Sequence, residues 1–179
     1  NAFFTGFGRT KRVVLFDTLV ERLDTPAVQS VLAHELAHWK RAHIWKNVAA
    51  SAVRVAVLLF LAQFLLEASW LYAMFDVPRT PAAGLLLAAL WLGPLDRLAS
   101  PLQNRLWFAY EREADAFARD VMGSGAPLAD ALAALTSENL SNPFPHPLYE
   151  AFHYTHPPVP ERIRTLTDAD DGDDAAPAG

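Results

Sequence analysis

The chain has 179 residues, of which 52% are hydrophobic, and it carries a formal net charge of −5 at pH 7. This length is enough for one domain with its own core, and nothing in the charge resembles a nucleic-acid-binding surface, so we expect no nucleic acid as partner. Cysteine is absent, which excludes a disulfide framework and restricts any metal site to His and carboxylate ligands.

The N-terminal quarter predicts a β-hairpin followed by a helix. Residues 1–5 and 12–16 are short apolar runs on either side of a glycine-containing turn, which is the pattern of two paired strands. Thr25 then reads as an N-cap, followed by Pro26 in the first helical turn. No Gly or Pro follows before Pro78, so we expect this helix to be able to continue into the apolar segment at residues 48–66.

Two apolar stretches, residues 48–66 and 82–95, predict a membrane-embedded helical hairpin over about residues 48–102. The second stretch ends near Pro94 and is short for a span. It crosses only with helical extension through Leu102, or it is partly re-entrant. A buried hairpin in a soluble core is the alternative. We favour membrane spans, with membrane lipid as a partner, because residues 55–66 are apolar apart from one Gln.

The C-terminal part predicts three helices and a disordered tail. Residues 103–122 form the first helix, which Gly123 closes, and residues 128–137 and 161–166 form two short ones. The proline-rich residues 142–147 are expected to be irregular. Residues 168–179 carry five Asp and no basic residue, so we expect them to be a disordered acidic tail.

The first predicted helix contains His34-Glu35-Leu36-Ala37-His38, an H-E-x-x-H motif. Residues four apart lie on one helix face, so both imidazoles are able to bind one zinc ion. Glu35 is placed to take a proton from the attacking water as general base. The alternative is a polar helix face with two solvated His residues, which four apolar neighbours disfavour: Val31, Leu32, Leu36 and Trp39.

A catalytic zinc ion needs a third protein ligand, and the spacing leaves several candidates. Glu111 and Asp115 share one face of their helix, so Glu111 is able to bind zinc while Asp115 holds a ligand His in place. Glu113 points roughly to the opposite side. His43 lies off the ligand face, and we expect it to be interfacial or solvated. The remaining candidates are the acidic groups of the tail and His146, His153 and His156.

These motifs together resemble the type I CAAX prenyl protease family, integral-membrane zinc peptidases related to bacterial heat-shock membrane metallopeptidases. The resemblance rests on HELAHWK at residues 34–40, YEREADAFA at 110–118, NAFF at 1–4 with residues 11–19, and the segment 146–162. It extends from residue 1 to about residue 166. Ala37 stands where these proteases usually have Gly, and we expect no effect on the metal because Ala favours the helix.

The resemblance implies a mainly α-helical fold with a small β-hairpin or edge sheet. Residues 1–167 would form a zincin-type catalytic domain, with the membrane hairpin inserted between the two helices that carry the zinc ligands. One zinc ion per chain would bind His34, His38 and Glu111, the last in preference to Glu113. Asp115 would support a ligand His.

The resemblance also implies the residues of catalysis and substrate binding. Glu35 would act with His156 and Arg162, which steady the oxyanion. A peptide or protein substrate would add as an extended strand along Asn1, Ala2 and Phe3. Two alternatives stay open, since His156 before two prolines is able to cap a turn and Arg162 is able to pair with an acidic group in solvent.

The expected function is zinc-dependent hydrolysis of peptide bonds by a membrane endopeptidase that trims C-terminal residues from prenylated CAAX proteins. One alternative is a general quality-control metalloprotease for membrane proteins. An alternative of another class is a non-catalytic membrane protein with a structural zinc site. Glu35 speaks against the last, because a structural site has no need of a general base.

The distribution of basic residues predicts the orientation in the membrane. Three basic residues crowd the zinc end of the first apolar segment and three follow the second, whereas the loop between them holds only Arg79. The positive-inside rule therefore places the active site on the cytoplasmic side. Twelve Arg against three Lys fit a GC-rich bacterial genome and hence a bacterial inner membrane. Because the chain starts at Asn1 without Met, we expect a C-terminal fragment with further spans upstream.

Overall fold

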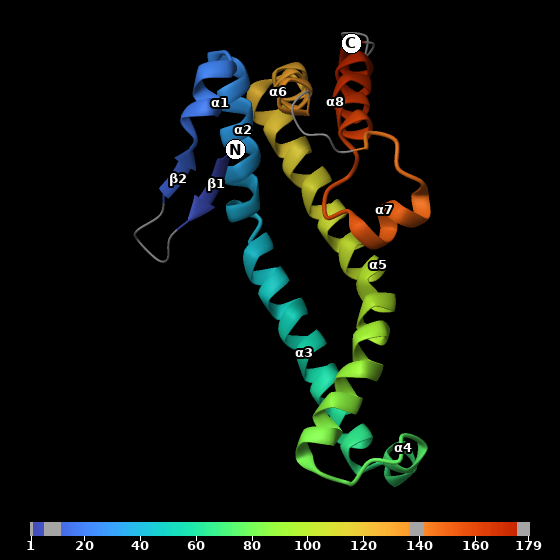
Figure 1. Cartoon of the computed structure of the whole chain (residues 1–179). Helices are drawn as coiled ribbons and strands as arrows, with labels where there is room; N and C mark the ends of the chain where they lie inside the picture. The colour runs from blue at the N-terminus through green and yellow to red at the C-terminus, as the bar shows by residue number, and fades with distance from the viewer. Residues whose placement is uncertain (1, 6–11, 137–141, 175–179) are drawn as a thin grey trace. The chain divides into compact units, whose positions relative to one another are not determined.

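The computed structural model describes residues 2–5, 12–136 and 142–174, which are mostly helical (Figure 1). The chain divides into two compact units, here called the site unit (Asn1–His43 with Asn104–Gly179) and the hairpin unit (Ile44–Gln103). The elements in chain order are β1 (Ala2–Thr5), β2 (Arg12–Leu15), α1 (Asp17–Arg22), α2 (Thr25–Lys40), α3 (His43–Glu67), α4 (Ser69–Met74), α5 (Pro81–Met122), α6 (Ala126–Thr136), α7 (Pro147–His153) and α8 (Val159–Asp174).

The predicted β-hairpin is confirmed. Strands β1 and β2 pair antiparallel, with Ala2 opposite Leu15 and Thr5 opposite Arg12. Strand β1 contacts α2 and lies between β2 and that helix (Figure 1). Within the described residues, β1 therefore pairs with a strand on one edge, and no strand pairs with its other edge. Asn1, the first residue of the expected substrate strand, lies outside the described residues.

Small residues on one face of α2 let the other helices of the site unit approach it. The helix begins after Asp24, whose carboxylate accepts a hydrogen bond from the amide of Ala27 at 2.9 Å, one residue before the expected N-cap. The core beside α2 draws on α5, α6 and α8, and its buried members are Ala33, Ala118, Leu128, Ala129 and Leu166. Apolar burial from four segments thus fixes α2, which carries the H-E-x-x-H motif.

The expectation of one helix from the motif into the first apolar segment is wrong. Helix α2 ends at Lys40, and α3 begins at His43. Between them Ala42 has a φ of 56°, in the left-handed region that a residue with a Cβ rarely adopts. No Gly or Pro marks this break in the sequence. Its consequence is that the chain changes direction immediately before His43.

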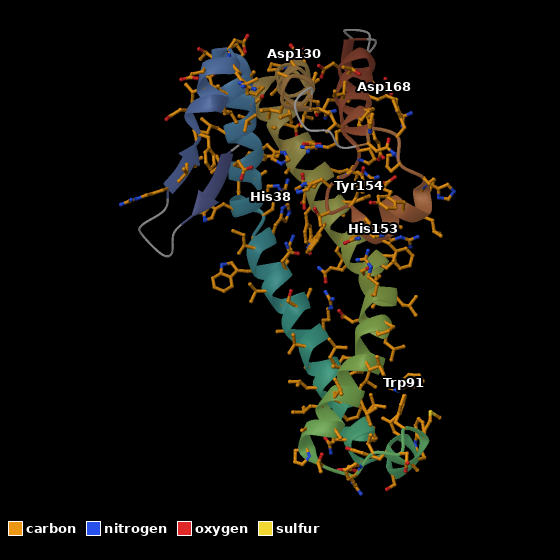
Figure 2. The ribbon with its side chains drawn as sticks, in the orientation of Figure 1. His38, Trp91, Asp130, His153, Tyr154 and Asp168 are labelled. Carbon is orange, nitrogen blue, oxygen red and sulfur yellow. The ribbon has the colours of Figure 1, made fainter. Side chains whose placement is uncertain are left out.

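Helices α3 and α5 are each long and apolar enough to cross a membrane, by length and composition. None of the most apolar stretch of α3 is buried within the structure, whereas a helix in a soluble core would be mostly buried. Large side chains project outward from both helices, as Trp91 does from α5 (Figure 2). We therefore treat α3 and the apolar part of α5, up to about residue 102, as candidate membrane spans, and the soluble-core alternative is disfavoured.

The helix predicted over residues 103–122 is not separate from the second apolar stretch, because α5 continues through Pro94 and Pro101 to Met122. The helical extension of the second apolar stretch is thus confirmed, and Gly123, with a φ of 74°, ends the helix as predicted. The connection between the spans contains α4, whose Leu71 and Tyr72 pack with Leu87 as the core of the hairpin unit.

Helix α6 and the irregular residues before α7 follow the sequence prediction, whereas α7 itself was not predicted. Helix α8 departs from the prediction, because it extends to Asp174 and includes the first part of the expected disordered tail. The carboxylate of Asp170 accepts hydrogen bonds from the hydroxyl of Ser124 at 2.7 Å and from the amide of Gly125 at 2.8 Å. These bonds hold the end of α8 against the start of α6. Residues 175–179 lie outside the described residues.

Candidate metal centre

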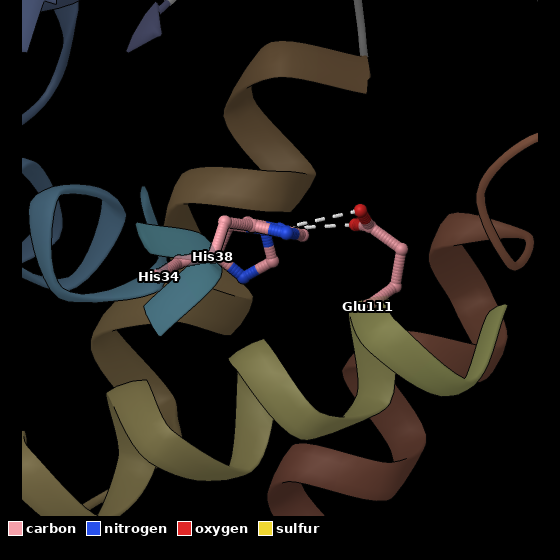
Figure 3. Close-up of side chains that lie close together, drawn as sticks. All are labelled: His34, His38 and Glu111. Atoms are coloured by element: carbon pink, nitrogen blue, oxygen red, sulfur yellow. Dashed lines mark hydrogen bonds and ion pairs between the residues drawn. The ribbon is translucent and has the colours of Figure 1, made fainter. Parts of the chain in front are cut away.

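His34 and His38 project from one face of α2 and meet Glu111 of α5 (Figure 3). The two Nε2 atoms lie 3.2 Å apart. The Glu111 carboxylate lies 3.5 Å from Nε2 of His34 and 3.4 Å from Nε2 of His38. The structure thus brings together the two histidines of the motif and Glu111, the third ligand that the family resemblance implies, and Glu113 is not part of this cluster.

The geometry of these three donors fits a zinc ion. Zinc–nitrogen and zinc–oxygen bonds of about 2.0–2.1 Å in a tetrahedral site place neighbouring ligand atoms roughly 3.3 Å apart, close to the separations observed here. Glu111 is buried, and its Oε2 atom makes no hydrogen bond of regular geometry within the described residues. A bound cation is one way in which such a buried carboxylate oxygen is satisfied. Two imidazole nitrogens and one carboxylate leave a fourth position for water or substrate, and His34 has to give up its proton when a metal binds.

Asp115 supports the first ligand from behind. Its Oδ1 atom lies 2.9 Å from Nδ1 of His34, on the side of the ring opposite Nε2. The same carboxylate accepts two hydrogen bonds from Arg162 of α8, and both residues are buried. Burial alone would raise the pKa of Asp115, but the contacts with His34 and Arg162 hold it below its ordinary value. A charged carboxylate at this position fixes the ring of His34 with Nε2 toward the ligand cluster.

The surroundings of the three proposed ligands shift their pKa values in different directions. Burial and the charge of His34 lower the pKa of His38 to about 4, so this imidazole is neutral at pH 7, as a ligand must be. Burial also acts to lower the pKa of His34, but Asp115 and Glu111 raise it to about 9. Burial would raise the pKa of Glu111, yet His156 and His34 hold it well below its ordinary value. Glu111 is therefore an anion at neutral pH.

Glu35 is half-buried beside the ligands. Burial raises the pKa of its carboxyl above the ordinary value of 4.5, and the positive charges of His34 and of two C-terminal residues, His156 and Arg162, oppose this shift only in part. A carboxylate with a raised pKa, next to a metal centre, is suited to accept and return a proton.

The two predicted oxyanion donors occupy different environments. His156 lies in the segment between α7 and α8, its side chain is 62% exposed, and its Nδ1 atom lies 2.9 Å from Oε2 of Glu111. Arg162 is buried and uses Nε and Nη2 for Asp115, while Nη1 lies 3.5 Å from Glu111. Both side chains therefore face the third ligand.

Two other histidines take no part in the cluster of three ligands. His146 is the N-cap of α7, where its Nδ1 atom accepts a hydrogen bond from the amide of Leu148 at 3.2 Å. His153 is exposed and stacks on Tyr149 with 4.3 Å between ring centroids; it is labelled in Figure 2.

No sequence pattern indicates that a second pair of residues, His43 and Glu113, lies behind His38. His43 is only 1% exposed, so the expectation of an interfacial or solvated group is wrong. Its Nδ1 atom lies 3.1 Å from Nδ1 of His38, and its Nε2 atom lies 2.9 Å from the Glu113 carboxylate. Helical spacing places His43 away from the ligand face, and only the break at Ala42 brings it back. A sequence pattern that assumes one straight helix is unable to reveal this contact.

The chain is similar to known peptidases over most of its length. The family described as "Peptidase family M48" matches residues 1–170. The CAAX prenyl protease 1 homologs of Oryza sativa subsp. japonica and Arabidopsis thaliana are each 38% identical to it, over 95% and 97% of the chain. The crystal structure of S. mikatae Ste24p aligns with a TM-score of 0.78 and 34% identity, covering 93% of this chain and 41% of that one. The chain spans 40% of the length of the two plant relatives.

Proposed function

Because the chain belongs to peptidase family M48, we propose that it is the catalytic part of a zinc-dependent membrane endopeptidase. His34, His38 and Glu111 bind one zinc ion per chain, and Glu35 is the general base. The observation that carries this proposal is the convergence of three ligand atoms within 4.8 Å of one another, one from each of these ligands, beside a half-buried glutamate.

A zinc ion bound there supplies Lewis acidity, which activates water and polarises the scissile carbonyl. Glu35 accepts a proton from the attacking water and passes it to the nitrogen of the leaving amine. His156, exposed next to Glu111, donates a hydrogen bond to the oxygen that becomes negative during the attack. Arg162 adds positive charge through Nη1, the guanidinium nitrogen that faces Glu111.

The substrate binds as an extended strand along Asn1, Ala2 and Phe3. Support comes from the position of β1, which pairs with β2 on one edge and contacts the helix of the motif. A peptide that adds to β1 gains backbone hydrogen bonds without regard to its sequence, so the reacting bond is chosen by other contacts.

The substrate class that we propose is a prenylated protein whose C-terminal residues are removed, in line with the names of the relatives. Membrane lipid is the second partner, through the two candidate spans. Basic residues cluster near the zinc end of the spans, which favours an active site that faces the cytoplasm, and the Arg-rich composition favours a bacterial inner membrane. If the source is bacterial, a second substrate class is unmodified membrane proteins, which a quality-control protease would cleave.

The deciding experiment uses the full-length protein in detergent, a farnesylated CAAX peptide and the same peptide without the lipid. Glu35→Gln should retain one zinc ion per chain and lose at least about 100-fold in kcat, since the base is removed and the ligands are not. Glu21→Gln, the same change at an exposed position of α1, is the matched control and should cleave like wild type.

The outcomes separate the candidate functions. Cleavage of the farnesylated peptide alone supports CAAX processing, and equal cleavage of both supports a general membrane protease. If wild type binds zinc but cleaves neither peptide nor an unfolded membrane protein, the site is structural and the proposal is wrong.

A further inference from the structure

We propose that His43 is a positioning residue of the metal centre, which holds the imidazole of His38 with Nε2 toward the metal, and that Glu113 holds His43 in turn. This inference rests on the proposed zinc site. It concerns His43 and Glu113, which are not among the three proposed ligands and lie on the far side of His38 from them.

The two ligand histidines have parallel arrangements on their far sides. Nδ1 of His34 faces the carboxylate of Asp115 directly, at 2.9 Å. Nδ1 of His38 instead faces Nδ1 of His43, at 3.1 Å. A ligand imidazole usually donates its second ring N–H to a carboxylate or carbonyl, which fixes its tautomer. For His38 an imidazole stands in that place, and the carboxylate follows one residue further back.

One assignment of hydrogens gives each facing nitrogen and oxygen in the contacts from His38 through His43 to Glu113 a hydrogen-bond partner. The carboxylate of Glu113 accepts only, so Nε2 of His43, 2.9 Å away, carries the hydrogen of that ring and donates it to Glu113. Nδ1 of His43 then accepts the hydrogen on Nδ1 of His38, which leaves Nε2 of His38 free to bind a metal. The opposite assignment would place a hydrogen of His38 at the point where the three ligand atoms converge. The contacts behind His38 therefore select the tautomer that binds metal.

The surroundings of His43 keep its ring in one orientation. The side chain is among the largest fully buried ones, and its ring stacks on Tyr110 of α5 at 4.4 Å between centroids with 17° between planes. The ring of His38 meets it edge-on at 5.1 Å. The positive φ of Ala42 turns the chain so that His43 faces back toward α2. A buried imidazole with both nitrogens close to partners, stacked on a tyrosine, has little freedom to rotate.

Glu113 is the outer end of the chain of contacts. Its side chain is 36% exposed, and its carboxylate also lies 3.4 Å from Nη1 of Arg41. The carboxylate is thus placed by Arg41, which lies in the break between α2 and α3, and by His43, the first residue of α3. The negative charge acts on His38 through one intervening ring, so we expect a weaker effect on the metal than that of Asp115 on His34.

The test measures the zinc dissociation constant of the full-length protein in detergent by competition with a chelator. His43→Leu removes both nitrogens and should weaken zinc binding by about 10–100-fold, the range found for partners of metal-ligating histidines. His43→Asn keeps an acceptor at the position of Nδ1 and should recover most of the affinity. Glu113→Gln should weaken binding by more than about twofold and by up to about tenfold. Asp120→Asn, an ion-paired carboxylate two turns further along α5, is the matched control and should match wild type.

A spectrum separates positioning of the ligand from a purely structural role. With cobalt in place of zinc, at saturating metal, His43→Leu and Glu113→Gln should shift the visible absorption bands and Asp120→Asn should not, because ligand orientation sets those bands. A residue that only stabilises the fold would lower the melting temperature of the metal-free protein and leave the bands unchanged. That result would overturn the proposal, and so would zinc binding within twofold of wild type for both His43→Asn and His43→Leu.

Failure of the underlying site gives a different result. If wild type itself binds no zinc in this range, the proposed function fails, and this inference fails with it. If wild type binds zinc tightly and the variants equal it, only the role of His43 is wrong. Should His43→Leu not fold, the half-exposed Glu113→Gln decides the question, and an unchanged affinity and cobalt spectrum there would reject the chain of contacts.

Discussion

Arg162 donates two parallel hydrogen bonds to Asp115, from Nε to Oδ2 at 2.8 Å and from Nη2 to Oδ1 at 2.6 Å. The second oxygen also lies 2.9 Å from Nδ1 of His34. A residue of α8 thereby supports a ligand on α2 through a carboxylate on α5. The last helix of the chain is consequently part of the support of the metal centre, although it contributes none of the three proposed ligands.

Replacement of Arg162 should weaken metal binding. Arg162→Leu leaves the buried carboxylate of Asp115 without its cation, and breaking such a buried pair typically costs about 3–5 kcal/mol. We expect the zinc affinity to fall by about 10–100-fold, as for other residues that support a ligand His. Arg162→Lys keeps the charge without the bidentate geometry and should lie between Leu and wild type.

Chelator competition and thermal unfolding measure this effect. The matched control is Arg164→Leu, which removes an exposed arginine two residues further along α8. If Arg162→Leu and Arg164→Leu bind zinc equally well, the ion pair does not support the site.

His156→Phe should separate catalysis from metal binding. The ring keeps its size but loses both nitrogens, so the developing oxyanion loses a donor, and kcat should fall roughly 100–1000-fold. Zinc content should stay at one ion per chain, because His156 lies beside Glu111 and is not one of the three proposed ligands. Steady-state cleavage and metal analysis give the two readings.

The control for this change is His153→Phe, since His153 is exposed and its stacking on Tyr149 survives in the variant. Parallel loss of zinc and activity in His156→Phe would assign His156 to the metal and not to the oxyanion.

Local spacing predicts the parts of the site that lie within single helices. His34 and His38 are four apart on α2, and Glu111 and Asp115 are four apart on α5, so one turn of each helix fixes both pairs. Selecting Glu111 over Glu113 needed the family resemblance, since spacing alone left both open. The β-hairpin could likewise be predicted from a short stretch of sequence, because two apolar runs and a turn define it.

Contacts that depend on tertiary structure could not be predicted from the sequence. The left-handed Ala42 that brings His43 to His38 is imposed on a residue that ordinarily favours helix, so propensity points the wrong way. Helix α5 continues through Pro94, which local rules treat as a break. The acidic tail was expected to be disordered from its composition, yet Asp170 is held by Ser124 and Gly125, 46 and 45 residues earlier in the chain.

Asp170→Asn should destabilise the junction of α6 and α8 at neutral pH. The hydrogen bond from Ser124, with those from the α6 amides, holds the pKa of Asp170 below its ordinary value of 3.8. A lowered pKa in the folded state means that the charged form adds stability above pH 3.8, which is lost as the pH falls through the folded pKa. Loss of a cap of this kind costs about 1 kcal/mol, or roughly 2–4 °C in melting temperature for a chain of this size.

The pH profile makes this prediction specific. The difference in melting temperature between wild type and Asp170→Asn should be constant from pH 5 to 8 and should shrink only below about pH 3.8. Asp168→Asn, on the same helix one half-turn earlier and outside the contact with Gly125, should show no such difference. A gap that instead persists at the lowest pH would show that the charge of Asp170 is not its source.

Gly84→Ala should destabilise the hairpin unit, and Gly93→Ala should not. A Cβ atom at Gly84 would clash with the hydroxyl of Tyr72 and lie 2.6 Å from Cδ2 of Leu66, whereas one at Gly93 meets nothing within 4 Å. Overpacking of this kind costs about 1–3 kcal/mol. At Gly93 the better helix propensity of Ala gives up to about 1 kcal/mol in the other direction.

Thermal unfolding in detergent should therefore rank Gly93→Ala at or above wild type and Gly84→Ala below it. The hydroxyl of Tyr72 donates to the carbonyl of Leu66 at 2.9 Å, so Tyr72→Phe alone should cost about 1 kcal/mol. Combined with Gly84→Ala, it removes the nearest clashing atom, and the double variant should lose less stability than the sum of the single changes. Strict additivity would mean that α4 and α5 do not pack as closely as Tyr72 and Gly84 do here.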